Sequence, residues 1–352
     1  MSKLQSLFSW TKSPLIVNAP MGGFAGPSLA TEVSLHGGFG FIGSGFSLKQ
    51  IEEHLGEAHS ILKTQGFSGR TGTLAIGIGF LLFYHKLEEV APLIEAYQPA
   101  AVWLFAAHDL DDYSTWAKEI RRVCPHTTIW VQVGSVADAI TVAENAEPDV
   151  LVAQGADAGG HGLEQGAGII SFVPELVKKL STLDLKKKPL LFAAGGIADG
   201  RGVAAALTLG AEGAVMGTRF LCSQEVTVPA LYQQAVLKAS DGGQSTVRGR
   251  VFDQLKGPNI WPMLYDGRSV VSESYTDWKS GLSVEQIQSR HAEAIKLPDG
   301  GFGASAGKGR AAIWAGTGVG LVNDVQKAGD IVESVRQEAR EALDKARQSL
   351  GL

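Results

Sequence analysis

The strongest constraint on the fold is an alternation of short apolar runs with segments of helical periodicity, which repeats over the first two-thirds of this 352-residue chain. Strands are predicted at Pro14–Asn18, Phe39–Gly43, Thr73–Gly79, Ala100–Phe105, Thr128–Val133, Asp149–Ala153, Leu190–Ala194 and Gly213–Met216. Helices are predicted at Ser28–Leu35, Leu48–Thr64, Glu88–Tyr97, Tyr113–Val123, Val136–Ala146, Val173–Leu180 and Gly200–Leu209. Strands that alternate with helices form a parallel sheet. Eight such units favour a closed (β/α)8 TIM barrel over an open, doubly wound sheet.

The alternation stops near Gln224. From there to residue 302 the chain has one clear helical segment, Pro229–Ala239, and an irregular stretch around Trp261-Pro262. We expect this part to be a smaller, mostly helical lid or substrate region over the mouth of the barrel. A Gly/Ala-rich loop, Gly300–Gly320, and a charged amphipathic helix, Asp330–Leu350, then return to the barrel. The predicted domains are therefore 1–223 with 303–352, and 224–302.

Composition excludes several classes of protein. The formal net charge of −5 and the absence of an Arg/Lys-rich patch argue against nucleic acid as a partner. No apolar run approaches the length of about 18 residues that a membrane span needs. Cys124 and Cys222 have no metal or redox spacing, and no His/Glu set suggests a metal site. We expect a cytoplasmic protein, and the sequence leaves a monomer and a homodimer both open.

The sixth predicted strand runs into a glycine-rich segment, Gln154–Gly162, which contains Gly159, Gly160 and His161. Glycine lets a ligand approach the backbone amides closely. Histidine titrates near neutral pH and is a common general acid or base. The alternative is a tight strand–loop turn that carries an exposed histidine.

Two further glycine loops follow the seventh and eighth predicted strands: Ala194-Gly195-Gly196-Ile197 and Met216-Gly217-Thr218-Arg219. These are the positions at which TIM barrels bind phosphate groups. The first loop also opens the helix predicted at Gly200–Leu209, whose N-terminal amides and dipole favour an anion. The alternative is a pair of tight packing turns.

Amide side chains stand at the ends of two neighbouring strands. Gln132 and Gln154 could both hydrogen-bond a polar heterocycle at the mouth of the barrel, although either could be a simple rim residue. Asn18, at the end of the first strand, has a similar ambiguity, whereas Met21 could be plain packing or could lie against a flat ring. Because neither a metal set nor a Gly-x-Ser-x-Gly nucleophile motif occurs, a phosphate-bearing cofactor is the expected source of chemistry.

Four motifs in order resemble the nitronate monooxygenase family, formerly called 2-nitropropane dioxygenases. They are Ala19-Pro20-Met21, the run from Ala153 to Gly162, Ala193-Ala194-Gly195-Gly196-Ile197, and Met216-Gly217-Thr218-Arg219-Phe220. The resemblance spans about Pro14 to Glu225 and resumes at Trp314-Ala315-Gly316.

The resemblance implies a TIM barrel that binds FMN non-covalently. The expected FMN-binding residues are Ala19, Pro20, Met21, Gly22, Gln132, Gln154, Gly159, Gly160, Ala194, Gly195, Gly196, Gly217 and Thr218. The Ala19–Gly22 turn would lie along the flavin ring, and the loop amides at Gly195-Gly196 and Gly217-Thr218 would hold the phosphate.

His161 would be the catalytic base for the oxidation of alkyl nitronates, and of nitroalkanes, by O2 to a carbonyl compound and nitrite. The barrel and its Gly-Gly-His motif also resemble those of NAD(P)H-dependent enoyl-acyl-carrier-protein reductases and NADH:quinone reductases. A reductase of either type is the alternative function. A more remote alternative is a non-catalytic barrel that binds a phosphate ligand.

Overall fold

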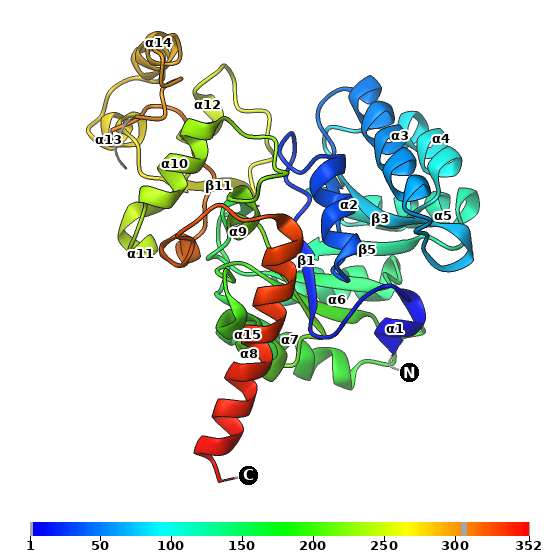
Figure 1. Ribbon diagram of the computed structural model, residues 1–352. Coiled ribbons are helices and arrows are strands. Elements are labelled where there is room, and N and C mark those ends of the chain that lie inside the picture. Colours follow the sequence, from blue (N-terminus) through cyan, green and yellow to red (C-terminus); the bar gives the residue numbers. More distant parts are fainter. Residues whose placement is uncertain (1–2, 304–307, 352) are drawn as a thin grey trace.

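Eight parallel strands form the centre of the molecule in the computed structural model, which describes residues 3–303 and 308–351 (Figure 1). The strands are β1 (Leu15–Asn18), β2 (Phe41–Gly43), β3 (Leu74–Leu81), β4 (Pro99–Phe105), β5 (Thr128–Val133), β6 (Val150–Gln154), β8 (Leu190–Ala194) and β9 (Gly213–Met216). They are ordered β1-β9-β8-β6-β5-β4-β3-β2, and a bridge between Val17 and Phe39 joins the two ends of the sheet. The predicted TIM barrel is confirmed.

Helices between the strands cover the outside of this barrel. They are α2 (Pro27–Leu35), α3 (Leu48–Thr64), α4 (Leu87–Tyr97), α5 (Asp111–Val123), α6 (Val136–Asn145), α7 (Ile169–Thr182), α8 (Gly200–Thr208) and the short α9 (Thr218–Leu221); η1 (Arg70–Gly72) is a single turn. The side chains of Ser135 and Asp199 cap α6 and α8. Each accepts a hydrogen bond from the backbone amide three residues further along the chain, that of Asp138 or Gly202. Such N-caps satisfy backbone donors that the helix itself leaves free.

Side chains that point into the barrel close its lower end. The short helix α1 (Lys3–Leu7) brings Phe8 against Phe39 and Trp130, with ring centroids 4.7 and 5.8 Å apart. Trp103 stacks on Trp130 at 5.9 Å, and all four rings are almost completely buried. Large aromatic rings thus fill the barrel at the amino ends of its strands, and the open space of the barrel lies at the carboxyl ends.

Asn18 has a structural role in closing the barrel. Its side chain accepts a hydrogen bond from the Phe41 amide at 2.9 Å and donates to the Phe41 carbonyl at 2.8 Å. These bonds bridge β1 and β2, which share no regular ladder. The ambiguity over Asn18 is therefore resolved in favour of a buried structural contact.

Residues 224–302 fold beside the barrel mouth, as the upper left of Figure 1 shows. Five helices lie there: α10 (Ala230–Lys238), α11 (Gly242–Ser245), α12 (Val251–Gln254), α13 (Glu273–Lys279) and α14 (Val284–Ala294). The region also holds β10 (Thr246–Gly249) and β11 (Tyr265–Val270), which form an antiparallel sheet with β7 (Gly160–Leu163). We call residues 224–302 the insertion; its limits as a domain stay a prediction.

The antiparallel sheet corrects one expectation. His161 and Gly162 do not lie in a turn but in β7, where His161 faces Gly267 of β11 across the ladder. A four-residue strand with two glycines, Gly160 and Gly162, has little β-propensity of its own. Pairing with residues about a hundred positions away overrides it, and only the stretch before Gly160 remains a turn.

The end of the chain returns to the barrel, as expected. After η2 (Thr317–Leu321), helix α15 (Ala328–Ser349) packs against α8 and α2, and its last turns project from the body (Figure 1). Arg336, on the buried face of α15, donates to the carbonyls of Pro14, His36 and Gly37. Burial lowers the pKa of Arg336, and the nearby Arg340 adds to the shift. The predicted loop Gly300–Gly320 is described except for residues 304–307.

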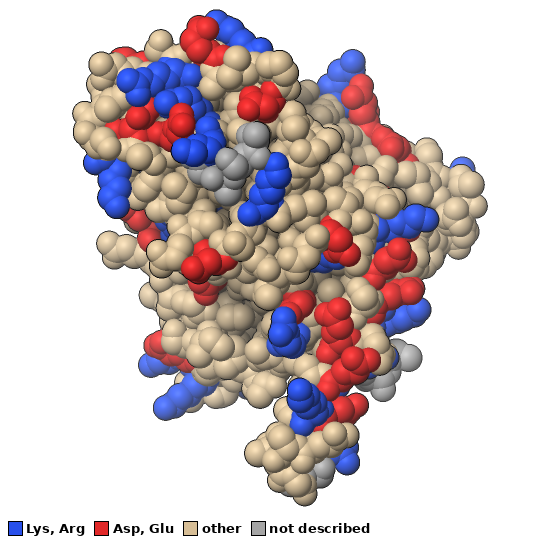
Figure 2. Space-filling model, turned by 60° about the vertical axis from the view of Figure 1, so that its left-hand side comes forward, with Lys and Arg blue, Asp and Glu red and all other residues tan. Residues whose placement is uncertain are grey.

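The surface carries charges of both signs. Acidic and basic side chains are interspersed on the face drawn in Figure 2, including the projecting end of α15. Across the described ranges, no helix is both long enough and apolar enough to cross a membrane.

Candidate active site

A cavity of about 390 Å³ opens at the carboxyl ends of the barrel strands, beneath the insertion. Its volume lies within the range typical of cofactor and small-molecule sites. All fourteen predicted site residues line it: Ala19, Pro20, Met21, Gly22, Gln132, Gln154, Gly159, Gly160, His161, Ala194, Gly195, Gly196, Gly217 and Thr218. The structure thus brings together residues that are spread over about 200 positions of the sequence, whereas their individual roles are proposals.

Two glycine loops present backbone to one side of this cavity. Gly195 and Gly196 have φ angles of +103° and +74°, a region in which side chains are strained, so glycine is required there. Within the described residues, the amides of Gly195, Gly196 and Gly217 have no hydrogen-bond acceptor. A Cβ on Gly217 would meet nothing closer than 3.8 Å. The loops therefore offer open amide donors to an anion, as a phosphate requires.

Two amides at the N-terminus of α8, which we expected to face an anion, already have carboxylate acceptors. The Asp199 carboxylate accepts from the Gly202 amide at 2.9 Å, and Glu338 of α15 accepts from the Gly200 amide at 3.0 Å. Two carboxylates already satisfy these donors and offset the helix dipole. A phosphate would have to be held by the loop before the helix instead.

The two glutamines use opposite ends of their amides for internal contacts. Gln132 accepts from the Trp103 indole at 3.1 Å through Oε1, which leaves its NH2 group as the remaining donor. Gln154 donates to the His161 carbonyl at 2.8 Å, which leaves its Oε1 as the remaining acceptor. Together they can serve a ring that has both acceptor and donor atoms on its edge.

The segment after β1 forms one wall of the cavity. Pro20 lies so close to Gly79 of β3 that a Cβ on Gly79 would overlap its ring. Met21 and Gly22 line the same space, and a Cβ on Gly22 would reach within 3.3 Å of the Ser44 carbonyl. This close packing fixes the backbone of the wall.

His161 projects from β7 and is held by residues of the insertion. Its Nε2 lies 2.6 Å from Oδ1 of Asp253, and the two side chains are only 14% and 4% exposed. The Trp261 ring stacks on the imidazole with a centroid distance of 3.7 Å and an interplanar angle of 6°. Trp314 lies 4.8 Å away on a tilted plane. His161 is therefore a residue of the cavity wall with a fixed orientation. The alternative of an exposed histidine in a turn is wrong.

Asp253, Trp261 and Trp314 line the cavity but were not predicted as site residues. Asp253 lies in the four-residue helix α12, and Trp261 in an irregular segment, so neither has a local pattern that indicates a site. The one available signal was Trp314, because the resemblance resumes at that residue.

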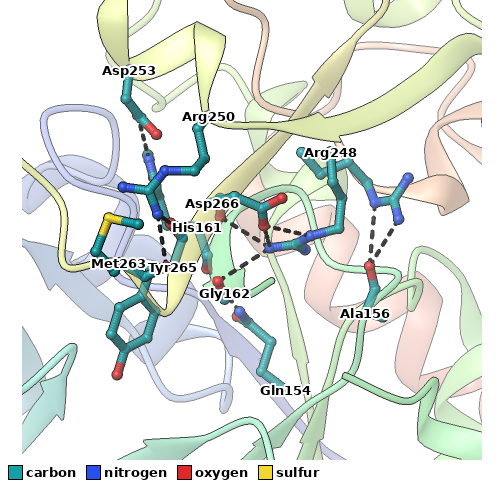
Figure 3. Close-up of polar contacts among 11 residues, drawn as sticks. Gln154, Ala156, His161, Gly162, Arg248, Arg250, Asp253, Met263, Tyr265 and Asp266 are labelled. Atoms are coloured by element: carbon teal, nitrogen blue, oxygen red, sulfur yellow. Dashed lines mark hydrogen bonds and ion pairs between the residues drawn. The ribbon is translucent and has the colours of Figure 1, made fainter. Parts of the chain in front are cut away.

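Two arginines brace the strand that carries His161 (Figure 3). Arg248 pairs with Asp266 and donates to the Gly162 carbonyl, while Nε and Nη2 of Arg268 both donate to the Ala156 carbonyl, at 3.2 and 3.1 Å. Burial lowers the pKa of Arg268, and the neighbouring Arg248 adds to this. The insertion thus fixes both ends of the glycine-rich segment.

The cavity contains little charge. Its lining, as far as the structure describes the chain, has no Lys or Arg, and its only titratable side chains are His161 and Asp253. Likewise, no group of three or more His, Cys, Asp or Glu with the geometry of a metal site occurs among the described residues. Apolar and backbone surfaces dominate.

An eight-stranded α/β barrel with a glycine-lined cavity at its mouth belongs to the class of TIM-barrel enzymes. Comparison with known proteins narrows the class. The family model "Nitronate monooxygenase" matches residues 83–252. A nitronate monooxygenase of Metarhizium robertsii is 41% identical, covering 95% of this chain and 93% of its own. One from Neurospora crassa is 38% identical, covering 98% and 94%. The chain belongs to the nitronate monooxygenase family, a family of flavin-dependent oxidoreductases.

Solved structures support the fold. FabK from Thermotoga maritima superposes with a TM-score of 0.74 at 22% identity, covering 99% of both chains. Nitroalkane oxidase from Streptomyces ansochromogenes gives a TM-score of 0.74, also at 22% identity, and covers 98% of this chain and 100% of that one. At such identities the likeness concerns the fold.

Proposed function

We propose that this protein is an FMN-dependent enzyme that oxidises alkyl nitronates, and neutral nitroalkanes, with O2 to a carbonyl compound and nitrite. The observation that carries the proposal is His161, stacked and hydrogen-bonded in a cavity that open glycine loops also line. Membership of the nitronate monooxygenase family and relatives of that name at 38–41% identity support the substrate class.

The residues present suit FMN. The amides of Gly195-Gly196 and Gly217-Thr218 would hold the phosphate, while Gln132 and Gln154 would bond the ring and Ala19–Gly22 would lie along it. Gly159, Gly160 and Ala194 line the same space. Bound there, FMN would supply the redox chemistry by accepting electrons from the substrate and passing them to O2.

His161 would act on the substrate. A nitroalkane loses the proton on the carbon next to its nitro group to the imidazole, and the electron pair moves into the nitro group to give the nitronate. With a preformed nitronate, the imidazole and nearby amides hold the anion. The apolar walls exclude water and strengthen these interactions, as electrostatic stabilisation requires. With an oxygen atom from O2 bonded to the carbon that bears the nitro group, cleavage of the C–N bond would release the carbonyl compound and nitrite.

A spectrum and two anaerobic mixing experiments test the proposal. The purified protein should show a flavin spectrum, and released flavin should be FMN. Anaerobic mixing with ethyl nitronate should change the flavin spectrum rapidly, whereas NADH should do so slowly or not at all. Rapid reduction by NADH with no response to the nitronate would reject the proposal in favour of a reductase on the same barrel. A colourless protein that takes up no FMN would indicate a non-catalytic barrel.

A further inference from the structure

We propose that Asp253 is a positioning residue that fixes His161 as the tautomer protonated on Nε2, so that Nδ1 is the atom that accepts the substrate proton. This inference rests on the proposed function for its kinetic consequence, but its structural content can be measured separately. It assigns a role in the reaction to the insertion as well as the barrel.

The tautomer follows from the contact between the two side chains. An ionised carboxylate can only accept hydrogen bonds, so the Nε2 atom that lies 2.6 Å from Asp253 Oδ1 must donate. In a neutral imidazole the other nitrogen then carries the lone pair. Nδ1 has no partner among the described residues, and is therefore free to act as the base.

The orientation of the ring is fixed as well. Trp261 lies flat on the imidazole at 3.7 Å, so the ring cannot rotate out of its plane without losing this contact. Both Asp253 and Trp261 come from the insertion, 92 and 100 residues after His161. Since two independent contacts hold the same ring, its unbound nitrogen has one defined position.

The carboxylate of Asp253 also has an electrostatic reason to favour proton uptake. The side chain is 4% exposed, and its second oxygen, Oδ2, is buried with no hydrogen-bond partner in the described structure. A buried charge with an incomplete set of partners is unfavourable. When His161 takes the substrate proton, the imidazolium that forms becomes its counter-ion. The step breaks the C–H bond, transfers the proton to Nδ1, and leaves the electron pair on the nitro group.

Asp253 has its own structural support. α12 is anchored by Val251, Phe252 and Leu255, which form a small core with Ile287 of α14. This core lies in the insertion, apart from the barrel's own cores. Loss of the carboxylate alone should therefore leave α12 in place.

Kinetics on two substrates provide the first test. In the FMN-bound Asp253→Asn enzyme, kcat/KM for neutral nitroethane should fall on the order of 100-fold or more, as expected when a base is wrongly oriented. The value for ethyl nitronate, which has no proton to lose, should fall by less than about tenfold. Asp253→Glu should recover part of the loss. Asp277→Asn, which removes a carboxylate that pairs with Arg290 and Arg310 away from the cavity, is the matched control and should change neither value.

Nuclear magnetic resonance gives the second test, which does not depend on turnover. In the holoenzyme labelled with ¹⁵N-histidine, two-bond ¹H–¹⁵N spectra of the neutral imidazole, recognised by its two unequal ¹⁵N shifts in a pH series, should show His161 protonated on Nε2. The His161→Asn variant assigns the signal. In Asp253→Ala the protonated nitrogen should change or become a mixture.

The outcomes separate the two proposals. Equal losses on both substrates, or an Nε2–H signal that persists in Asp253→Ala, would overturn the role of Asp253. A wild-type enzyme that turns over neither nitroethane nor ethyl nitronate would reject the proposed function, and the tautomer measurement would still decide the role of Asp253. If the enzyme turns over ethyl nitronate but not nitroethane, the tautomer measurement again decides the role of Asp253.

Discussion

His161 combines the features expected of a general base. It is almost buried, stacked on Trp261 and bonded through one nitrogen only. No other histidine lines the cavity in the described ranges. His85, for example, contacts the backbone of Leu81 through Nδ1 and the Gly45 carbonyl through Nε2, and burial lowers its pKa, as expected for a neutral structural histidine.

The first prediction concerns this residue. His161→Asn should bind FMN as the wild type does, because we propose that the glycine loops, and not the imidazole, hold the phosphate. Turnover of nitroethane should fall by a factor on the order of 10² to 10⁴, with a smaller loss for ethyl nitronate. Steady-state assays with flavin quantified by absorbance check both statements. Equal losses on the two substrates would show that His161 acts as an electrostatic contact and not as a base.

At the scale of elements, the turn after β6 and the segment before η2 depend on each other. A Cβ on Gly159 would overlap the backbone of Ala315, and one on Gly316 would lie 2.5 Å from the Asp157 carbonyl. Two glycines thus allow two loops to touch backbone to backbone, and the Gly316 amide also donates to Thr218 at 3.0 Å. This contact places Trp314 beside His161.

A glycine substitution tests this contact. Gly159→Ala should lower the free energy of unfolding by about 1–3 kcal/mol, because overpacking forces the backbone to shift. It should also weaken FMN retention. Gly243→Ala is the control, since a Cβ there meets nothing within 4 Å and its φ is not positive. Thermal melts and flavin content measure the two effects; identical melts for both variants would contradict the argument.

The strands and helices of the barrel were predictable because each is specified by local pattern. Continuous apolar runs such as Leu190–Ala194 place all eight strands correctly to within a few residues. The glycine motifs likewise identify residues that line the cavity. The strand β7 and the partners of His161 could not be predicted, because they depend on pairing between residues about a hundred positions apart. Asp253 has no distinguishing neighbours in the sequence and becomes visible only once β7 and α12 are folded together.

At the scale of the whole molecule, the cavity's charge sets a limit on substrates. A nitronate brings one negative charge, and the lining has no Lys or Arg within the described chain to balance a second. The buried carboxylate of Asp253 adds to the repulsion. Burying an unpaired carboxylate costs several kcal/mol even after relaxation.

Two nitronates of similar shape test this limit. Propionate 3-nitronate should have a kcat/KM at least about 100-fold below that of 3-methylbutyl nitronate, since a carboxylate and an isopropyl group differ mainly in charge. Parallel assays at one ionic strength measure the ratio. Comparable values would mean that a cation outside the cavity lining reaches the substrate.

The C-terminal helix is a second feature of the whole molecule. Arg336 joins α15 to carbonyls of residues 14, 36 and 37, some 300 positions away in sequence. Arg336→Met should lower the free energy of unfolding by about 2–4 kcal/mol, because several buried acceptors lose a charged donor. Arg340→Met, at an exposed position, is the control and should have a much smaller effect. Chemical denaturation measures both; similar midpoints for the two variants would contradict a special role for Arg336.

The β10-β11-β7 sheet has a practical consequence for enzyme engineering. It couples the histidine to a part of the chain that contributes none of the glycine loops proposed to hold a phosphate. Variation confined to residues 250–263, which include Asp253 and Trp261, should therefore change reactivity and substrate choice more than cofactor affinity. Directed evolution of this enzyme can therefore keep the barrel sequence constant and vary the insertion.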